Sequence, residues 1–397
     1  MSLRDEVIAL ENRYIVQTYR RSDFVLDRGE GVYLYDTDGN RYLDFSAGIA
    51  VNALGYGDPE IMQVIQDQAG RYFHVSNLYH MEPMARLAQS LADLSFGDRV
   101  FFCNSGAEAN EGAFKFARKW GRRDGADRYE IVAFTGAFHG RTFGALAATP
   151  REQYQAPFRP LIGGVSVARF NDLDSAERAV TSKTCAIVVE PIQGEGGINV
   201  ADGEFIRGLR RLCDDRGLLL IVDEVQCGLG RTGRLWAYQQ YGIEPDMMTL
   251  AKPLGGGLPM GAVVVTEDVA SVIEPGDHGS TFAANALISR VAQVVVRRVS
   301  DEGFLAHVRD VGGYLGEQLR LLAERKPNVV EVRGMGLMWA LELTDEAAPY
   351  VSKGYREGAI MLVAGPRVLR LLPPLVIGKE HVDEMIAILD RVLPDQG

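Results

Sequence analysis

The middle of the chain carries a succession of short apolar runs, each of which ends in a polar residue or a glycine. Patterns typical of helices separate the runs, which read RVFFCNSG, IVAFTGAFHG, AIVVEPIQG, LLLIVDE, MMTLAK and AVVVT. Strands that are apolar throughout and alternate with helices indicate a mostly parallel sheet with both faces covered. Because ligands bind at the carboxyl ends of the strands in such sheets, we expect the functional residues where these runs end.

The segments on either side of this sheet have other patterns. The first residues combine a Ser2-x-x-Asp5 capping signal with apolar residues at helical spacing, and a β-hairpin follows around Asp38-Gly39. After about residue 300, a long helical pattern precedes shorter strands and a last helix. A chain of 397 residues has room for two to three domains at roughly 150 residues each. We expect an N-terminal segment (1–48), a large domain (49–298) and a small α/β domain (299–397), which the N-terminal segment joins.

Composition excludes several classes of partner. The chain has 42 Lys and Arg against 53 Asp and Glu, a net charge of −11, which repels nucleic acid and anionic lipid. No run reaches the roughly 18 apolar residues of a membrane span, and charged residues interrupt what would be a signal peptide at Arg4, Asp5, Glu6 and Glu11. The four cysteines match no zinc or redox spacing. We expect a soluble cytoplasmic protein with reduced thiols and small-molecule partners.

Lys252 follows the run MMTLA and precedes Pro-Leu-Gly-Gly-Gly. A partly buried lysine at a strand end has a lowered pKa and can form a Schiff base. A phosphate-binding P-loop is an alternative, although its glycines precede the lysine instead of following it. A surface lysine at the start of a loop is the other alternative.

Asp223 ends the apolar run LLLIV. A buried carboxylate needs a cation beside it, and the protonated pyridine nitrogen of pyridoxal phosphate is such a cation. A metal ligand and a helix N-cap are alternatives. The six histidines contain no H-E-x-x-H pattern, and none of them lies near Asp223 in sequence, so we expect no metal.

Asn104 to Asn110 (NSGAEAN) follow the run RVFFC and open a helical pattern. Small residues at a helix N-terminus let backbone N–H groups reach a phosphate, and Ser105 adds a hydroxyl. An ordinary Ser-Gly turn before a helix is the alternative. Ser280 and Thr281, in HGSTF, offer further hydroxyl donors.

Four further residues fit the binding of a planar ring and of carboxylates. Phe138 stands where a strand ends and can stack on a ring, while His139 beside it fits a structural histidine. Arg141 and Arg370 have apolar sequence neighbours, as expected for arginines that bind carboxylates. Glu195 lies in a glycine-rich segment that can bring it close to one of them. Surface salt bridges are the alternative for Glu195 and both arginines.

Together these stretches resemble the class III (ω-) aminotransferases, which are pyridoxal-phosphate enzymes of fold type I. The resemblance runs from RGEGVYLYDTDGNRYLDFSAGIAVNALGY to AGPRVLRLLPPLVI and is carried by FFCNSGAEANEGAFKFARK, AFHGRT, VVEPIQGEGGI, LLLIVDEVQCGLGRTG and HGSTFAANAL. It implies a large domain with a mostly parallel central sheet covered by helices, and a smaller α/β domain built from the N- and C-terminal segments. It also implies a homodimer with shared active sites.

The resemblance assigns the cofactor-binding residues. Lys252 would carry the internal aldimine and move the proton, Asp223 would pair the pyridine nitrogen, Gln226 would bond the phenolic oxygen and Phe138 would stack on the ring. The phosphate would be held by a further set: Ser105, Gly106, Ala107 and, across the dimer, Thr281 of the partner subunit.

The resemblance also assigns the substrate-binding residues. Arg141 would bind the α-carboxylate of the amino donor, with Ser280 and Tyr19 nearby. Arg370 would bind the α-carboxylate of glutamate. Glu195 would neutralise Arg370 while the ω-amino donor is bound and swing away for glutamate.

The resemblance is strongest to the enzymes that transaminate N-acetylornithine with 2-oxoglutarate. Gly48 stands where ornithine-specific members carry an aromatic residue, which leaves room for an acyl group. Succinylornithine, ornithine, N-acetyl-lysine-type substrates and 4-aminobutyrate remain open, as do an aminomutase, a decarboxylase and a phosphate-binding protein without catalysis. The chain departs from the family pattern at Pro253, which should stiffen the lysine loop, and at three alanines near the phosphate site: Ala283, Ala284 and Ala286.

Overall fold

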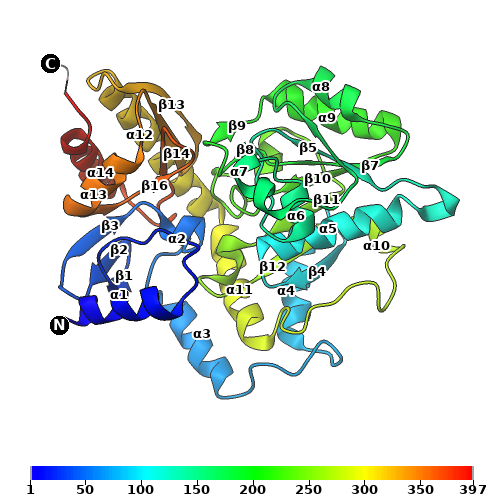
Figure 1. Ribbon diagram of the computed structural model, residues 1–397. Coiled ribbons are helices and arrows are strands. Elements are labelled where there is room, and N and C mark those ends of the chain that lie inside the picture. The colour runs from blue at the N-terminus through cyan, green and yellow to red at the C-terminus, as the bar shows by residue number, and fades with distance from the viewer. Residues whose placement is uncertain (1, 396–397) are drawn as a thin grey trace.

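The computed structural model describes residues 2–395, which form the mixed α/β architecture of Figure 1. Its largest sheet has seven strands in the order β4-β12-β11-β10-β7-β5-β6. Their bounds are β4 (Arg99–Cys103), β5 (Glu130–Phe134), β6 (Val165–Ala168), β7 (Thr184–Val189), β10 (Leu219–Asp223), β11 (Met247–Leu250) and β12 (Gly261–Val265). The non-consecutive order shows that crossover connections build the sheet.

The predicted mostly parallel sheet is confirmed, with one strand in the opposite direction. β12 pairs antiparallel with β11 and with β4, while the remaining pairs are parallel. The run that forms β12, AVVVT, has the same apolar character as its neighbours. Its direction follows from the connection: residues 251–260 hold only a short 3-10 helix, η4 (Lys252–Gly255), whereas a parallel return needs a longer crossover.

Both faces of the sheet are buried, which explains why its strands are apolar throughout. On one face, Leu220 and Val222 of β10 join a core that includes Phe205 and Leu209. This face is covered by α3 (Pro59–Ala69), α4 (Glu82–Asp93), α8 (Leu173–Ala179), α9 (Gly203–Arg216) and α11 (Ala286–Val299). Ile221 of the same strand faces the other core, which is covered mainly by α5 (Gly106–Trp120) and α10 (Glu267–Ala270).

The rest of the described chain packs beside this sheet (Figure 1). The N-terminal strands β1 (Leu26–Glu30), β2 (Tyr33–Asp36) and β3 (Arg41–Asp44) form a sheet with β15 (Ala359–Ile360), in which Leu43 lies opposite Ala359 in parallel register. A second four-stranded sheet, β13-β14-β17-β16, consists of β13 (Val329–Met335), β14 (Met338–Leu343), β16 (Leu362–Val363) and β17 (Val368–Leu371). N- and C-terminal segments therefore share one body, while the boundaries at 48 and 298 remain a prediction.

Helices complete the small body and the connections. The small body contains α12 (Glu302–Ala323), α13 (Ala348–Arg356) and α14 (Lys379–Val392), whose apolar faces share one core with β14 and β17. The shorter elements are α2 (Ala47–Ala50), α6 (Phe143–Ala147), α7 (Glu152–Gln155), β8 (Ile192–Gln193), β9 (Asn199–Val200), η1 (Arg123–Gly125), η2 (Ala156–Phe158) and η3 (Ala237–Gln240). The predicted first helix, α1 (Leu3–Tyr14), begins at the Ser2 capping box but buries none of its residues. Among residues 2–395, every helix is too short or too polar to cross a membrane.

Candidate active site

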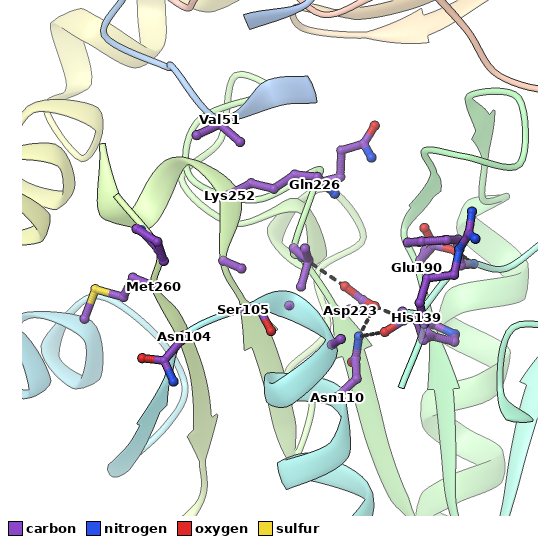
Figure 2. Close-up of a pocket in the computed structure, with 18 of the residues that line it drawn as sticks. Val51, Asn104, Ser105, Asn110, His139, Glu190, Asp223, Gln226, Lys252 and Met260 are labelled. Carbon is purple, nitrogen blue, oxygen red and sulfur yellow. Dashed lines mark hydrogen bonds and ion pairs between the residues drawn. The ribbon is translucent and has the colours of Figure 1, made fainter. Parts of the chain in front are cut away.

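A cavity of about 450 Å³ lies at the carboxyl ends of the central strands (Figure 2). Its wall includes residues that directly follow β4, β7 and β11, the last residue of β10, and residues 138–141 in the loop after β5. Eight of the residues predicted for the site line it: Ser105, Gly106, Ala107, Phe138, Arg141, Asp223, Gln226 and Lys252. The edge of the sheet that the sequence favoured is therefore where these side chains meet.

Asp223 is 3% exposed at the floor of this cavity. Its Oδ2 accepts hydrogen bonds from Asn110 Nδ2 at 2.8 Å and from His139 Nδ1 at 2.7 Å, and its Oδ1 accepts one from the Val225 N–H at 3.0 Å. Asn110 lies on α5 and also receives a bond from Thr249 Oγ1 on β11. Three donors from three parts of the chain therefore fix the orientation of one carboxylate.

The hydrogen bonds also decide the charge of Asp223. Burial acts to raise its pKa, but His139, together with the bonds from Val225 and Asn110, outweighs burial and holds the pKa below its ordinary value. Burial acts to lower the pKa of His139, and Asp223 reverses this and raises it. The pair therefore favours a carboxylate beside an imidazolium, with the buried His139 Nε2 lacking a protein partner.

Lys252 begins η4, with one residue between it and the end of β11, and its side chain extends into the cavity (Figure 2). Its φ is +37°, in the left-handed region that costs a non-glycine residue about 1–2 kcal/mol. Burial lowers the pKa of Lys252 below the ordinary 10.5, against the opposing effect of the charges on Glu195 and Asp223. A strained backbone and a less basic amine are properties of a nucleophilic lysine.

The N-terminus of α5 opens into the same cavity. Ser105 is its N-cap, and the Ser105 hydroxyl accepts the N–H of Glu108 at 3.2 Å. The first N–H groups of a helix have no partner inside the helix, which leaves those of Gly106 and Ala107 directed toward an anion. A Cβ on Gly106 would lie 2.7 Å from Val225, so glycine is needed for this close approach.

Arg141 lies at the mouth of the cavity and is exposed. Its guanidinium stacks on the Tyr154 ring, with 3.7 Å from Cζ to the ring centroid. The loop beside it is held by Glu111 of α5, whose Oε1 accepts bonds from Thr142 Oγ1 and from the N–H groups of Gly144 and Ala145. Arg141 is therefore accessible to a ligand while its loop is fixed.

The buried Arg370 and the partly exposed Glu195 form an ion pair next to the cavity wall. Arg370 Nη1 lies 2.5 Å from Glu195 Oε1 and 3.4 Å from the oxygen of Gln226, which lines the cavity. Burial acts to raise the pKa of Glu195, but the positive charge of Arg370 holds it below its ordinary value. Arg370 is 2% exposed, so Glu195 masks a cation that would otherwise be available to a carboxylate.

Five predicted residues lie outside the cavity wall: Arg370 and Glu195 beside it, and Ser280, Thr281 and Tyr19 elsewhere. Ser280 and Thr281 line a separate depression, and Ser280 Oγ accepts a hydrogen bond from Asn104 at 2.8 Å. Tyr19 is 74% exposed. Close to Thr281, Ala284 has a φ of +46°, so one of the alanines that depart from the family pattern occupies a conformation that favours glycine.

Gly48 lies in a turn next to Val51, which lines the cavity. The φ values of Ala47, Gly48, Ile49 and Ala50 are all positive, between 47° and 64°. A Cβ on Gly48 would lie 2.9 Å from the Asn52 amide nitrogen. Gly48 itself is not part of the cavity wall, so its effect on the size of the acyl group stays a prediction.

Besides His139, two buried polar residues of the cavity wall had no role assigned from the sequence. Asn110 lies one helical turn into α5, and Glu190 follows β7; both are buried and line the wall. The signal for Glu190 was present, because it follows the apolar run AIVV just as Asp223 follows LLLIV. Within residues 2–395, the structure brings together no cluster of His, Cys, Asp and Glu that could hold a metal ion.

The fold and the site belong to a known class of proteins. The family described as aminotransferase class III matches residues 14–393, and the chain belongs to this family. It is 47% identical to the acetylornithine aminotransferase of Methanocaldococcus jannaschii, with 98% of each chain covered.

Solved structures of aminotransferases have the same fold as this chain. The N-acetylornithine aminotransferase of Stenotrophomonas maltophilia has a TM-score of 0.84 at 36% identity, over 97% of this chain and 98% of that one. The ornithine aminotransferase of Toxoplasma gondii has a TM-score of 0.94 at 30% identity, over 99% and 95%. A second structure of that Toxoplasma enzyme is described as having PLP at partial occupancy in its active site. It has a TM-score of 0.94 at 31% identity, over 98% of this chain and 94% of that one.

Proposed function

We propose that this aminotransferase uses pyridoxal phosphate to move the side-chain amino group of N2-acetyl-L-ornithine to 2-oxoglutarate. The products are N-acetylglutamate 5-semialdehyde and L-glutamate. One arrangement carries the proposal: Lys252 and the buried Asp223 face the same cavity, which lies between an accessible arginine, Arg141, and a masked one, Arg370.

The residues present fit the cofactor. A carboxylate has about four acceptor sites, and Asp223 uses three of them, two on Oδ2 and one on Oδ1. One site is left for a protonated ring nitrogen. The free N–H groups of Gly106 and Ala107 suit the phosphate, and Phe138 and Gln226 also line the cavity wall.

When bound, pyridoxal phosphate supplies an electron sink for the carbon that loses its proton. Lys252 would hold the cofactor covalently and then carry that proton, since a buried amine with a lowered pKa can be neutral and accept it. Arg141 would bind the α-carboxylate of the donor and thereby direct the distal amine toward Lys252. Asp223, oriented by its bond from His139, would hold the proton on the ring nitrogen.

Two substrates must use one site in turn, and the Glu195–Arg370 pair offers a way to do so. With Glu195 in place, as in this structure, Arg370 is neutralised and the uncharged end of the cavity suits the side chain of the ω-amino donor. When Glu195 moves away, Arg370 becomes free to bind the α-carboxylate of glutamate or 2-oxoglutarate. The cycle is then ping-pong.

The choice of N-acetylornithine is supported by the names of relatives at 43–47% identity and by the missing side chain at Gly48. Ornithine, succinylornithine, N-acetyl-lysine-type donors and 4-aminobutyrate are the alternatives. We also propose a homodimer, in which Thr281 of the partner subunit reaches the phosphate, and a cytoplasmic location.

A single-turnover experiment without any 2-oxo acid tests this function. The holoenzyme is mixed in turn with N-acetylornithine, ornithine and 4-aminobutyrate, and the loss of the yellow absorbance of the bound cofactor is timed. We expect the fastest loss with N-acetylornithine and no loss in Lys252→Ala. Faster loss with ornithine would refute the proposed substrate but not the reaction, while turnover by Lys252→Ala would refute the role of the lysine.

A further inference from the structure

Glu190 is a buried carboxylate in the cavity wall to which the proposed reaction assigns no role. It follows β7 directly and is 6% exposed. Figure 2 places it on the same side of the pocket as His139. A carboxylate is costly to bury unless several donors satisfy it, so its hydrogen bonds indicate what it does.

The two oxygens of Glu190 bond to two different loops. Oε2 accepts the backbone N–H of Phe138 at 2.9 Å, and Oε1 accepts that of Gly194 at 3.3 Å. We call residues 135–141 the Phe138 loop and residues 192–197 the Glu195 loop. The first carries the predicted ring-stacking residue, and the second carries the carboxylate that masks Arg370.

The two loops are also packed against each other. Gln193 Nε2 donates to Thr135 O at 2.8 Å, and a Cβ on Gly136 would lie 2.7 Å from Gln193 Oε1. A Cβ on Gly196 would lie 2.7 Å from Gly136 O. Because contacts this close leave no free space, a displacement of either loop has to be accommodated by the other.

The chemistry of the contact requires a carboxylate. An ionised carboxylate accepts from two N–H groups at once, whereas a glutamine amide offers one oxygen and turns N–H donors toward the second backbone N–H. The charged groups near Glu190 are His139 from the Phe138 loop, Asp223 from β10 and Lys252 after β11. Burial raises the pKa of Glu190 to about 7, partly offset by His139, so the carboxylate that accepts both N–H groups predominates above that pH.

We propose that Glu190 is a positioning residue that joins the Phe138 loop to the Glu195 loop, so that the contact with the cofactor ring and the masking of Arg370 change together. This inference rests on the proposed function, because the Glu195 movement affects catalysis only if Arg370 binds glutamate. The link between the loops, in contrast, concerns only residues of this chain.

Hydrogen exchange measures the link directly. The test compares the amides of Phe138 and Gly194 in the full-length holoenzyme, in Glu190→Gln and in Glu224→Gln. Glu224 is a matched control: it is a buried carboxylate after β10 that accepts two backbone N–H groups, those of Ala237 and Tyr238, outside the cavity wall.

We expect both amides to exchange about tenfold faster in Glu190→Gln, since a glutamine can keep at most one of the two bonds and loss of either bond loosens both of the packed loops, and to be unchanged in Glu224→Gln. Faster exchange at only one amide, or equal changes in the control, would overturn the proposal. If Glu190→Gln does not fold, Glu190→Asp keeps the charge but shortens the reach by one methylene. The same increase at both amides is then expected, and an increase at one alone overturns the link.

Kinetics of the two half-reactions give a second readout. In Glu190→Gln the KM for glutamate should rise by about tenfold, and the circular dichroism of the bound cofactor should change with it. A changed KM with an unchanged cofactor signal would contradict the coupling. If wild-type enzyme does not transaminate at all, the proposed function fails, while the exchange experiment still decides whether Glu190 joins the loops.

Discussion

Arg370 is a buried guanidinium whose acidic partner is Glu195. Its Nη1 is shared among Glu195, Gly194 O and Gln226, and its Nε has no protein partner. Removing one member of a buried pair leaves the other charge uncompensated. The side chain of Glu195 is 22% exposed, so it is the member with room to move.

We therefore predict that Glu195→Ala shifts selectivity toward donors that carry an α-carboxylate next to the reacting amine. Relative to N-acetylornithine, kcat/KM for glutamate should rise by about tenfold or more, because Arg370 is permanently free. Steady-state kinetics with both donors measure the ratio. Glu331→Ala, which removes an exposed acid from the Arg333 pair, is the control, and an unchanged ratio in Glu195→Ala would contradict the masking role.

We predict that the buried Lys252 lowers the free energy of unfolding of the protein. In the folded chain burial lowers its pKa below 10.5, so between the two pKa values the unfolded state binds more protons. Stability then rises with pH through this window. Below the folded-state pKa, the loss of stability caused by burying the charged lysine has its full size.

Lys252→Met should stabilise the cofactor-free protein by on the order of 1 kcal/mol at neutral pH, and less at about pH 10. Urea unfolding at both pH values measures this, with exposed Lys183→Met as control; a gain that grows with pH would contradict it.

At the scale of elements, the sequence predicts the strands of the central sheet well because burial on both faces makes them apolar throughout. It does not predict the direction of β12, which depends on the short connection after Lys252. It also misses β6, whose run VSVA is too short and too polar at Ser166 to stand out. Residues at strand ends, such as Asp223, are visible in the sequence. Asn110 is not, because its role depends on how α5 packs over β10.

The small body offers a prediction about how two helices are joined. Lys326 lies three residues beyond α12, and its side chain is 1% exposed. Its Nζ donates to Asp390 O and to Asp395 Oδ1, both at 2.5 Å, and to Leu393 O at 3.3 Å. One buried ammonium thus satisfies carbonyls at the end of α14, where the helix itself leaves them without partners.

We predict that Lys326→Met destabilises the protein by about 2–3 kcal/mol, because buried carbonyl groups lose a charged donor. Chemical unfolding measures this loss. Arg325→Met removes the neighbouring, largely exposed partner of Asp390 and should cost less than about 1 kcal/mol. The half-reaction rates at low denaturant should be unchanged in both variants. Equal destabilisation by the two changes would refute the argument from burial.

At the scale of the whole molecule, the described chain leaves a set of large apolar side chains exposed around the 280–283 segment. Asn77 Nδ2 bonds to Ser280 O and Ala283 O, which ties this segment to residues 72–79. The exposed members are Phe73, Leu78, Tyr79 and Phe282, with exposures of 54%, 85%, 66% and 62%. Exposed apolar side chains of this kind are suited to a subunit interface, and Thr281, which we propose to reach the phosphate of the partner subunit, is part of the same segment.

If this surface is the proposed dimer contact, a charge placed on it should separate the subunits and weaken cofactor binding in the same step. Phe282→Asp should raise the dimer dissociation constant by about 30-fold or more, equivalent to about 2 kcal/mol of lost apolar burial. Sedimentation velocity measures the dissociation, and the cofactor absorbance that survives dialysis measures retention. Val330→Asp, at an equally exposed apolar residue of the small body (59%), should change neither. A dissociated Phe282→Asp that retains its cofactor would show that the phosphate site is complete within one subunit, because the loss of Thr281 of the partner subunit would then have no effect.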